Sequence, residues 1–355
     1  MFRSVALAVL GVITLAACGG GSSAPEAAYV DPVRDAPAVS VASTWVEGVQ
    51  SPWSILPIGD AALVSERDSG RIVRIEPDGS VTAVATIDGV VHEGESGLLG
   101  LAMSPQGDAV YAYYTTVTDN RVVRMAWDGT NLGSPSDVVT GITKNTFHDG
   151  GGLVFGPDGM LYVATGDAGA PELSQELGSL NGKILRVRPD GGAPDDNPIP
   201  DSPVYSLGHR NVQGLAFDSQ GQLWATEFGT SEADELNQIV AGGNYGWPMY
   251  EGVAGAEGFI DPVAQWSPTS LASPSGLAIL GETAYVASLR GEVLWQVPLV
   301  GDAAAEPLAL DLGDLGRLRA IAVDGSGRIL LATSNTDGRG DVRDGDDRIL
   351  ILEVA

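Results

Sequence analysis

The segment F-H-D-G-G-G-L-V-F-G-P-D-G-M-L-Y-V-A-T-G-D at 147–167 sets out the repeat from which the fold is inferred. His148 precedes a short apolar strand, a P-D-G turn follows, and a second apolar strand ends in V-A-T. The run G-H-R-N-V-Q-G-L-A-F-D at 208–218 starts the same unit with His209. Units that each bring a polar group to the start of their first strand predict a toroid with a site at its mouth.

The two-strand unit occurs six times, at 52–67, 97–114, 151–165, 212–227, 275–289 and 318–333. A third strand follows each pair, at 70–75, 121–126, 182–187, 235–240, 291–297 and 347–354. The units are spaced by about 44 to 63 residues, close to the period of four-stranded propeller blades. We therefore predict an all-β fold, a six-bladed β-propeller over 45–355. A series of β-sandwiches would not account for the repeated register.

The composition and net charge of the chain argue against some classes of binding partner, charge more strongly than composition. The chain has 355 residues and a formal net charge of −27, with 18% charged and 44% hydrophobic residues. Such a charge repels phosphate, so nucleic acid and anionic membrane surfaces are not expected partners. The 48 glycines and 21 prolines fit a globular, turn-rich protein.

The N-terminus has the features of a processing signal. Arg3 is followed by an apolar stretch at 5–17, too short for a transmembrane helix, which ends in L-A-A-C at Cys18. This motif resembles the lipobox of bacterial lipoproteins. We predict a signal peptide over 1–18, lipidation of Cys18, and a flexible Gly-, Ser-, Ala- and Pro-rich tether over 19–44. A buried structural thiol is the alternative for this single cysteine.

The polar residues that interrupt the repeat lie at the starts and ends of the strand pairs: Glu95, His148, Arg210, Asn211, Gln213, Arg290, Arg317 and Arg319. In a chain with few basic residues, four arginines at equivalent positions predict a positive pocket on one face. Arginine suits a carboxylate or quinone-carbonyl ligand because its planar fork makes two parallel hydrogen bonds. A histidine held neutral among arginines suits a general base. A structural network between blades is the alternative for Arg210 and Asn211, and a simple strand-start hydrogen bond for His148.

The chain resembles the soluble, pyrroloquinoline-quinone-dependent glucose, sorbosone and aldose sugar dehydrogenases over about 50–355. The resemblance rests on ordered motifs, among them E-S-G-L-L-G-L-A, H-D-G-G-G-L-V-F-G-P-D-G, N-G-K-I-L-R, G-H-R-N-V-Q-G-L, G-G-N-Y-G-W-P, S-L-R-G and G-R-L-R. The combination of G-H-R-N-x-Q-G-L with G-G-N-Y-G-W-P in this order is the more specific part.

The resemblance implies a role for each of these residues. His148 would be the base that takes the proton of the sugar's anomeric hydroxyl while hydride passes to the quinone. The implied cofactor-binding residues are Arg210, Asn211, Gln213, Arg290, Arg317 and Arg319, and Glu95 would line the substrate side. The carbonyls of Gly229 and Thr230 would bind an active-site Ca²⁺. Glu235 and the Tyr245 carbonyl would form a second calcium position.

Several positions depart from the family pattern. Glu95 stands where a neutral amide is usual, Gly152 where many members have arginine, Phe147 where some have aspartate, and Ala320 where aspartate is common. Losing an arginine and gaining a carboxylate would weaken the site of an anionic cofactor. The acidic run 337–347 lacks the spacing of an EF-hand loop and is interpreted as a charged loop.

The sequence as a whole predicts an exported, lipid-anchored enzyme on the outer side of the bacterial cytoplasmic membrane or in the periplasm. It would oxidise an aldose to a lactone with pyrroloquinoline quinone and Ca²⁺, and pass electrons to an acceptor that the sequence does not name. Neither the sugar nor the oligomeric state can be derived. A non-catalytic propeller that binds a ligand in a degenerate pocket is the alternative. A metal-dependent lactone hydrolase would need several converging carboxylate, Asn or His ligands, whereas the strand starts offer mostly arginine.

Overall fold

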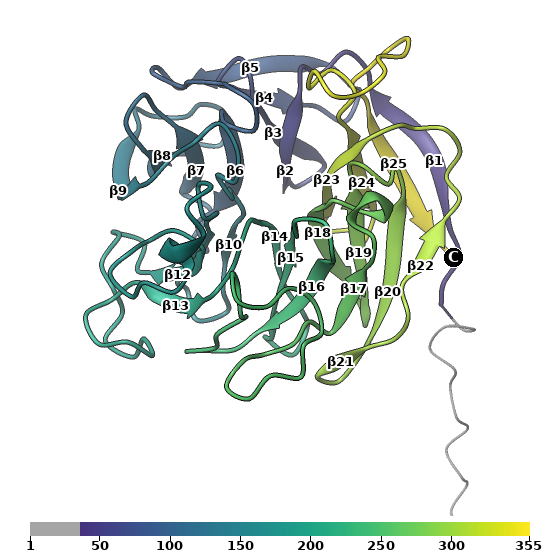
Figure 1. The fold of residues 1–355 in the computed structure, drawn as a ribbon. Helices are drawn as coiled ribbons and strands as arrows, with labels where there is room; N and C mark the ends of the chain where they lie inside the picture. The colour runs from purple at the N-terminus through teal and green to yellow at the C-terminus, as the bar shows by residue number, and fades with distance from the viewer. Residues whose placement is uncertain (1–35) are drawn as a thin grey trace, which may run out of the picture. The chain divides into compact units, whose positions relative to one another are not determined.

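The computed structural model describes residues 36–355, which form six antiparallel β-sheets arranged as the blades of a propeller (Figure 1). The first strands of the blades contact each other in the closed order β2, β6, β10, β14, β18, β23 and β2 again. The predicted all-β, six-bladed β-propeller is thereby confirmed. Two 3-10 helices, Pro171–Ser174 and Thr269–Leu271, interrupt the loops of the third and fourth blades.

Each blade runs from an inner strand at the axis to an outer strand at the rim. The first two blades contain β2 (Pro52–Ile58), β3 (Ala61–Glu66), β4 (Arg71–Ile75), β5 (Val81–Thr86), and β6 (Leu98–Met103), β7 (Ala109–Thr115), β8 (Asn120–Ala126), β9 (Ser136–Ile142). The next two contain β10 (Leu153–Phe155), β11 (Leu161–Ala164), β12 (Lys183–Val187), β13 (Val204–Leu207), and β14 (Val212–Phe217), β15 (Leu223–Glu227), β16 (Asp234–Ile239), β17 (Ala264–Trp266). The fifth contains β18 (Pro274–Leu280), β19 (Thr283–Ser288), β20 (Leu294–Val300), β21 (Ala303–Ala304) and β22 (Leu308–Leu310), and the sixth β23 (Leu318–Val323), β24 (Ile329–Thr333), β25 (Ile349–Val354) and β1 (Val39–Val46).

The N-terminal strand completes the last blade. β1 pairs antiparallel with β25, from Val39 opposite Val354 to Val46 opposite Ile349. The strand therefore begins inside the segment 19–44 that composition assigned to a tether, and the folded part starts before the predicted Trp45. Most of β1 is exposed because it lies at the outer edge of its sheet, so its sequence lacks the apolar alternation that marks the inner strands.

The hydrophobic core lies between neighbouring blades. Tyr111 and Tyr113 of β7, for example, are fully buried in one cluster with Leu161 and Val163 of β11 in the next blade. Because each sheet buries both faces against its neighbours, the second strands consist almost entirely of buried residues. Within residues 36–355, no helix is long and apolar enough to span a membrane.

Glycines allow the first strands to approach each other closely at the axis. A Cβ on Gly152 would lie 2.7 Å from the carbonyl oxygen of Gln213 in the next blade. A Cβ on Gly214 would lie 2.6 Å from the Ser275 carbonyl oxygen, and one on Gly276 would lie 2.7 Å from that of Arg319. Gly152 is therefore required by packing between blades, since an arginine would not fit against the Gln213 backbone.

Replacing Gly276 with alanine should destabilise the propeller, because the new methyl group meets backbone atoms that cannot rotate away. We expect G276A to lower the free energy of unfolding by about 1–3 kcal/mol, as overpacking does. Gly325 provides the matched control, because a Cβ there meets nothing within 4 Å. Urea unfolding should leave G325A at or slightly above wild type; equal stability of the two variants would contradict the packing argument.

Candidate functional site

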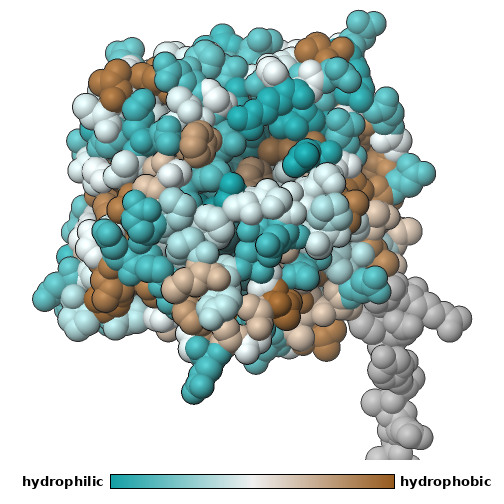
Figure 2. Space-filling model, viewed as in Figure 1, coloured by the Kyte–Doolittle hydropathy of each residue, from teal (hydrophilic) through white to brown (hydrophobic). Residues whose placement is uncertain are grey.

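One end of the axis gathers the polar residues that the sequence singled out. First and second strands of a blade are antiparallel, so the start of the first strand and the end of the second lie together at this end. Below them is a narrow cavity of about 120 Å³ that is lined by the first strands of all six blades, with Trp53, Gly152 and Gln213 among its residues. In the space-filling view, hydrophilic side chains gather around the centre of the ring (Figure 2).

His148 is held from both sides of its ring. Its Nδ1 lies 2.7 Å from Asp167 Oδ1, and the other Asp167 oxygen accepts a hydrogen bond of 2.9 Å from the Trp247 indole. Its Nε2 lies 2.7 Å from Nη2 of Arg210. The guanidinium can only donate, so Nε2 accepts and the ring proton sits on Nδ1, where it is donated to Asp167. This geometry selects the neutral tautomer with a basic Nε2.

Glu95 supports the backbone of the same histidine. Its Oε2 accepts a 3.0 Å hydrogen bond from the His148 N–H, at a residue whose φ of 60° is in the left-handed region. Oε2 also lies 3.3 Å from the Asn211 amide nitrogen, and Oε1 pairs with Arg339 at 3.2 Å. Burial opposes ionisation of Glu95, but the His148 N–H and the Arg339 charge outweigh it, and its pKa lies below the ordinary value.

Asn211, Gln213 and Arg319 continue the network across the axis. The Asn211 side-chain oxygen accepts from the Gly150 N–H at 3.0 Å and lies 3.3 Å from the Gln213 amide nitrogen. The Gln213 oxygen in turn accepts a 2.8 Å hydrogen bond from Arg319. The structure thus joins Glu95, His148, Arg210, Asn211, Gln213 and Arg319 into one hydrogen-bonded cluster, which we call the axial cluster.

Arg317, directly before β23, and Arg319, within β23, have different environments. Arg317 is paired with Asp337 at 3.0 Å. Arg319 is only 4% exposed, bonds to the neutral groups of Gln213 and Ser275, and has its guanidinium 5.7 Å from the Trp53 ring centroid. Burial lowers the pKa of Arg319 to about 9 despite the attraction of Asp337. A buried cation without a carboxylate in contact is suited to an anionic ligand.

Arg210, like Arg319, is a cation whose guanidinium has no carboxylate in contact among the described residues, and one of its hydrogen-bond donors is unused. Its Nη1 donates to the Phe228 carbonyl at 2.9 Å and to the Gly229 carbonyl. The central carbon of its guanidinium, Cζ, lies 5.6 Å from the centroid of the Trp247 ring. Its Nε is buried and has no hydrogen-bond partner among residues 36–355. This orphaned donor, together with Arg319, fits an anionic cofactor better than a structural network that is already complete.

Two of the predicted cofactor-binding residues lie outside the axial cluster, namely Arg317, which is paired with Asp337, and Arg290. Arg290 is exposed after β19, and among the described residues its side chain makes no hydrogen bond or ion pair, while its backbone N–H bonds to the Ala272 carbonyl. His209, the other motif histidine, is fully buried between Ser206 and Glu227, each at 2.8 Å, and serves packing below the site.

The first predicted calcium position is partly occupied by protein contacts. The Gly229 carbonyl accepts from Arg210, so a cation there would have to compete with a guanidinium. Thr230 is exposed, and its N–H and hydroxyl both bond to the Glu251 carboxylate, at 2.8 Å and 2.7 Å. Gly229 and Thr230 therefore offer a cation fewer free oxygen donors than the predicted position at Glu235 and Tyr245.

The second predicted position combines Glu235 with the Tyr245 backbone. Both residues line a cavity of about 10 Å³ together with Glu227, Glu251, Gly229 and the cationic Arg210, and this is about the space that one small ion or water needs. Burial, with Glu227 nearby, raises the pKa of Glu235 to about 8 although Asn237 and the Gly252 N–H oppose it. The two neighbouring buried carboxylates of Glu227 and Glu235 are oxygen donors of the kind that suits Ca²⁺.

Several residues that bond to the predicted site residues were not found from the sequence. Asp167 and Trp247 orient His148, and Asp337 and Arg339 come from the acidic run that was interpreted only as a charged loop. A signal for Asp167 was present, because it follows the second strand of its blade in V-A-T-G-D, at a place similar to that of Glu227 in W-A-T-E.

Several known proteins are similar to this chain. It matches the model of the Glucose / Sorbosone dehydrogenase family over residues 49–349. Quinoprotein glucose dehydrogenase B of Acinetobacter calcoaceticus is 34% identical over 55% of this chain and 49% of its own length. An aldose sugar dehydrogenase of Escherichia coli is 27% identical over 85% and 92% of the two chains.

A solved structure supports the same relationship. The PQQ-bound form of aldose sugar dehydrogenase from Streptomyces coelicolor superposes with a TM-score of 0.87 and 51% identity, and the match covers 90% of this chain and 98% of that one. With the fold, the ordered motifs and the axial cluster already in agreement, these matches show that the chain belongs to the Glucose / Sorbosone dehydrogenase family and is a sugar dehydrogenase.

Proposed function

We propose that the protein oxidises the anomeric hydroxyl of an aldose to a lactone with pyrroloquinoline quinone, and that His148 is the general base. The observation that carries this proposal is the position of the His148 ring between Asp167 at Nδ1 and Arg210 at Nε2, from which we infer a lone pair on Nε2 and a proton on Nδ1. A base poised in this way needs no proton rearrangement before it accepts the hydroxyl proton. The relatives that bind this quinone support the choice of cofactor.

The residues around the His148 ring have distinct tasks in this proposal. Asp167 stabilises the imidazolium that forms when Nε2 takes the proton, and its own orientation is fixed by Trp247. Arg210, released from Nε2 when the sugar hydroxyl takes its place, remains next to the reacting atoms as a positive charge. Phe147, whose ring stands edge-to-face on His148 and is 40% exposed, provides an apolar surface for the sugar.

The cofactor would be held by Arg319, Arg210, Asn211 and Gln213. Pyrroloquinoline quinone carries carboxylates and, when bound, supplies the hydride acceptor. Arg319 and the free Nε of Arg210 give its anionic groups cationic partners that the described part of the protein leaves without carboxylates in contact. Arg317 would contribute less, since Asp337 already neutralises it. Arg290 would contribute only from the exposed edge.

We also propose a calcium requirement and an extracytoplasmic location. The carboxylate of Glu235 and the Tyr245 carbonyl are better candidates for holding Ca²⁺ than Gly229 and Thr230, because the neighbouring carboxylates of Glu235 and Glu227 supply negative charge. Lipidation of Cys18 would anchor the protein to the outer side of the cytoplasmic membrane, and this residue lies outside the described part of the chain. The electron acceptor is assigned no identity.

Reconstitution tests the proposed activity. Apoprotein supplied with pyrroloquinoline quinone and Ca²⁺ should reduce a redox dye with a panel of aldoses. H148A should lose about 10²–10⁴-fold in kcat, and D167N should lose a similar factor because an amide no longer selects the basic Nε2. Cofactor affinity, measured by titration, should stay near wild type in both variants. Saturable cofactor binding with H148A as active as wild type would overturn the role of His148.

Charge changes at Glu95 and Arg339 should shift cofactor affinity in opposite directions. E95Q removes a negative charge beside the proposed anion site and should lower the Kd for pyrroloquinoline quinone about fivefold, on the order of 1 kcal/mol. R339A removes the neutralising cation and should raise the Kd. E93Q makes the same charge change on an exposed neighbour and should leave the Kd unchanged; a shift as large as that of E95Q would rule out a local effect.

Stabilisation by Ca²⁺ should depend on pH through Glu235. Its pKa is raised, so without metal this group contributes stability that is lost as pH rises from about 4.5 through about 8. Calcium must displace the proton, and the rise in Tm on adding Ca²⁺ should therefore be larger at pH 8.5 than at pH 6. E235Q should abolish the rise, whereas E232Q, at an exposed neighbouring position, should keep it. A full calcium effect in E235Q would exclude this site.

A further inference from the structure

A large cavity lies away from the axial cluster. It is a groove of about 470 Å³ between the third and fourth blades, lined in part by Pro157, Asp158, Gly221 and Gln222 of the β10–β11 and β14–β15 turns. These turns are at the opposite end of the first strands from His148. The volume lies within the roughly 300–1,000 Å³ of small-molecule sites.

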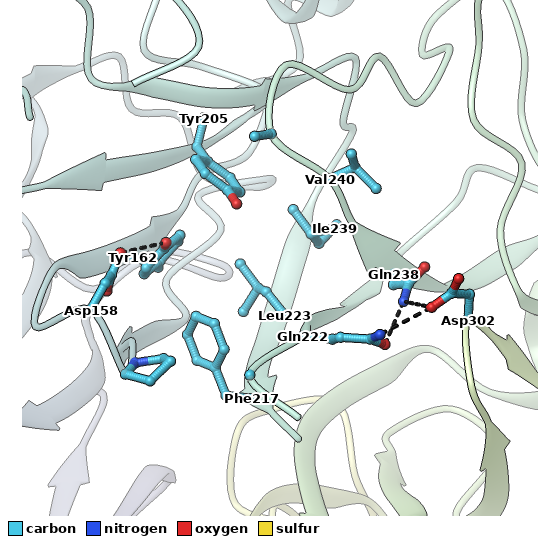
Figure 3. Close-up of a pocket in the computed structure, with 13 residues that line it drawn as sticks. Asp158, Tyr162, Tyr205, Phe217, Gln222, Leu223, Gln238, Ile239, Val240 and Asp302 are labelled. Carbon is cyan, nitrogen blue, oxygen red and sulfur yellow. Dashed lines mark hydrogen bonds between the residues drawn. The ribbon is translucent and has the colours of Figure 1, made fainter. Parts of the chain in front are cut away.

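One side of the groove is an array of aromatic rings (Figure 3). The buried Tyr162 ring stands edge-to-face with Tyr205 at 5.1 Å and with Phe217 at 5.2 Å, so a fixed centre positions two half-buried rings. The Tyr162 hydroxyl is bonded to Asp158, whereas the Tyr205 hydroxyl makes no hydrogen bond within residues 36–355. The array thus offers apolar ring surface and one free hydroxyl in the same place.

The other side offers neutral and acidic hydrogen-bonding groups (Figure 3). Gln222 donates to Asp302 at 3.0 Å, and Gln238 donates to the Gln222 oxygen at 2.6 Å. These contacts lie at the surface and can be exchanged for those of a ligand without stranding a buried group. Among the described residues that line the groove there is no lysine, arginine or histidine. Of its two carboxylates, Asp158 is paired with Arg186 at 2.9 Å, so Asp302 is the negative charge that disfavours an anion.

We propose that this groove is a second, non-catalytic site that binds a neutral saccharide. Sugar rings combine an apolar CH face with a rim of hydroxyls, which matches an aromatic wall opposite amides and a carboxylate. The Asp302 charge, with no cation among the described lining residues, disfavours the anionic quinone, so we expect an occupant that differs from that of the axial cluster. The site would hold part of a longer saccharide, or a second sugar, on the face opposite to the proposed chemistry.

The test uses the full chain without cofactor and the methyl glycoside of maltotriose, which has no free anomeric hydroxyl and cannot be oxidised. Calorimetric titration should give saturable binding that persists in H148A. Q222A and Y205F should each raise the Kd about tenfold, which corresponds to about 1.4 kcal/mol. Q220A, on the same turn but outside the groove, should bind like wild type. All variants with an intact axial cluster should retain wild-type dye reduction, so failure here is separable from failure of the proposed activity.

Three results would overturn the proposal. One is the absence of saturable binding to the wild-type chain. Another is unchanged affinity in both Q222A and Y205F, and the third is loss of binding in H148A, which would place the saccharide at the axial cluster. A glucuronate-terminated trisaccharide should bind more weakly than the neutral probe, because Asp302 repels it and the described lining residues include no cation; equal or tighter binding would contradict the charge argument.

Discussion

The close approach of the first strands at the axis is the constraint on which the other features depend. Backbone meets backbone at Gly152, Gly214 and Gly276, so the ring has room there for only a narrow cavity. Strands packed this tightly bring the residues at their starts within hydrogen-bonding distance of one another. Glu95 and Arg339 are 244 positions apart in the chain and are nevertheless joined by an ion pair. The fold therefore assembles a site from short contributions of several blades.

The site is polar but only partly compensated. Arg317 and Asp337 form a closed pair, whereas Arg319 and the Nε of Arg210 keep unused capacity in buried positions. Burying an uncompensated cation costs stability, which is tolerable where a ligand provides the missing charge. The groove on the opposite face differs, since its described lining residues include the carboxylate of Asp302 and no cation, while Asp158 is already paired with Arg186. The two ends of one scaffold are thus suited to ligands of different charge.

The sequence predicts the repeat well because the inner strands combine apolar runs with glycine and turn residues at constant offsets. The outer strands are harder to predict: β5 is mostly exposed, and β1 lies at a sheet edge, so neither shows strong periodicity. Among site residues, His148 and Arg210 follow from their motifs. Arg339 does not, since only the fold of the 337–347 loop brings it to Glu95. Arg290 shows the converse, because a matching motif does not ensure contact with the cluster.

The pairing of β1 with β25 has a consequence for how the molecule reaches its native state. The ring is closed by non-covalent strand pairing between the two ends of the described chain. A nascent chain emerges with β1 first and β25 last, so the sixth blade has no complete sheet until synthesis is nearly finished. Closing so long a loop is entropically unfavourable and makes this pairing a late event. Until then β1 is an unpaired strand edge exposed to other chains, and a partner that shields it would favour productive folding.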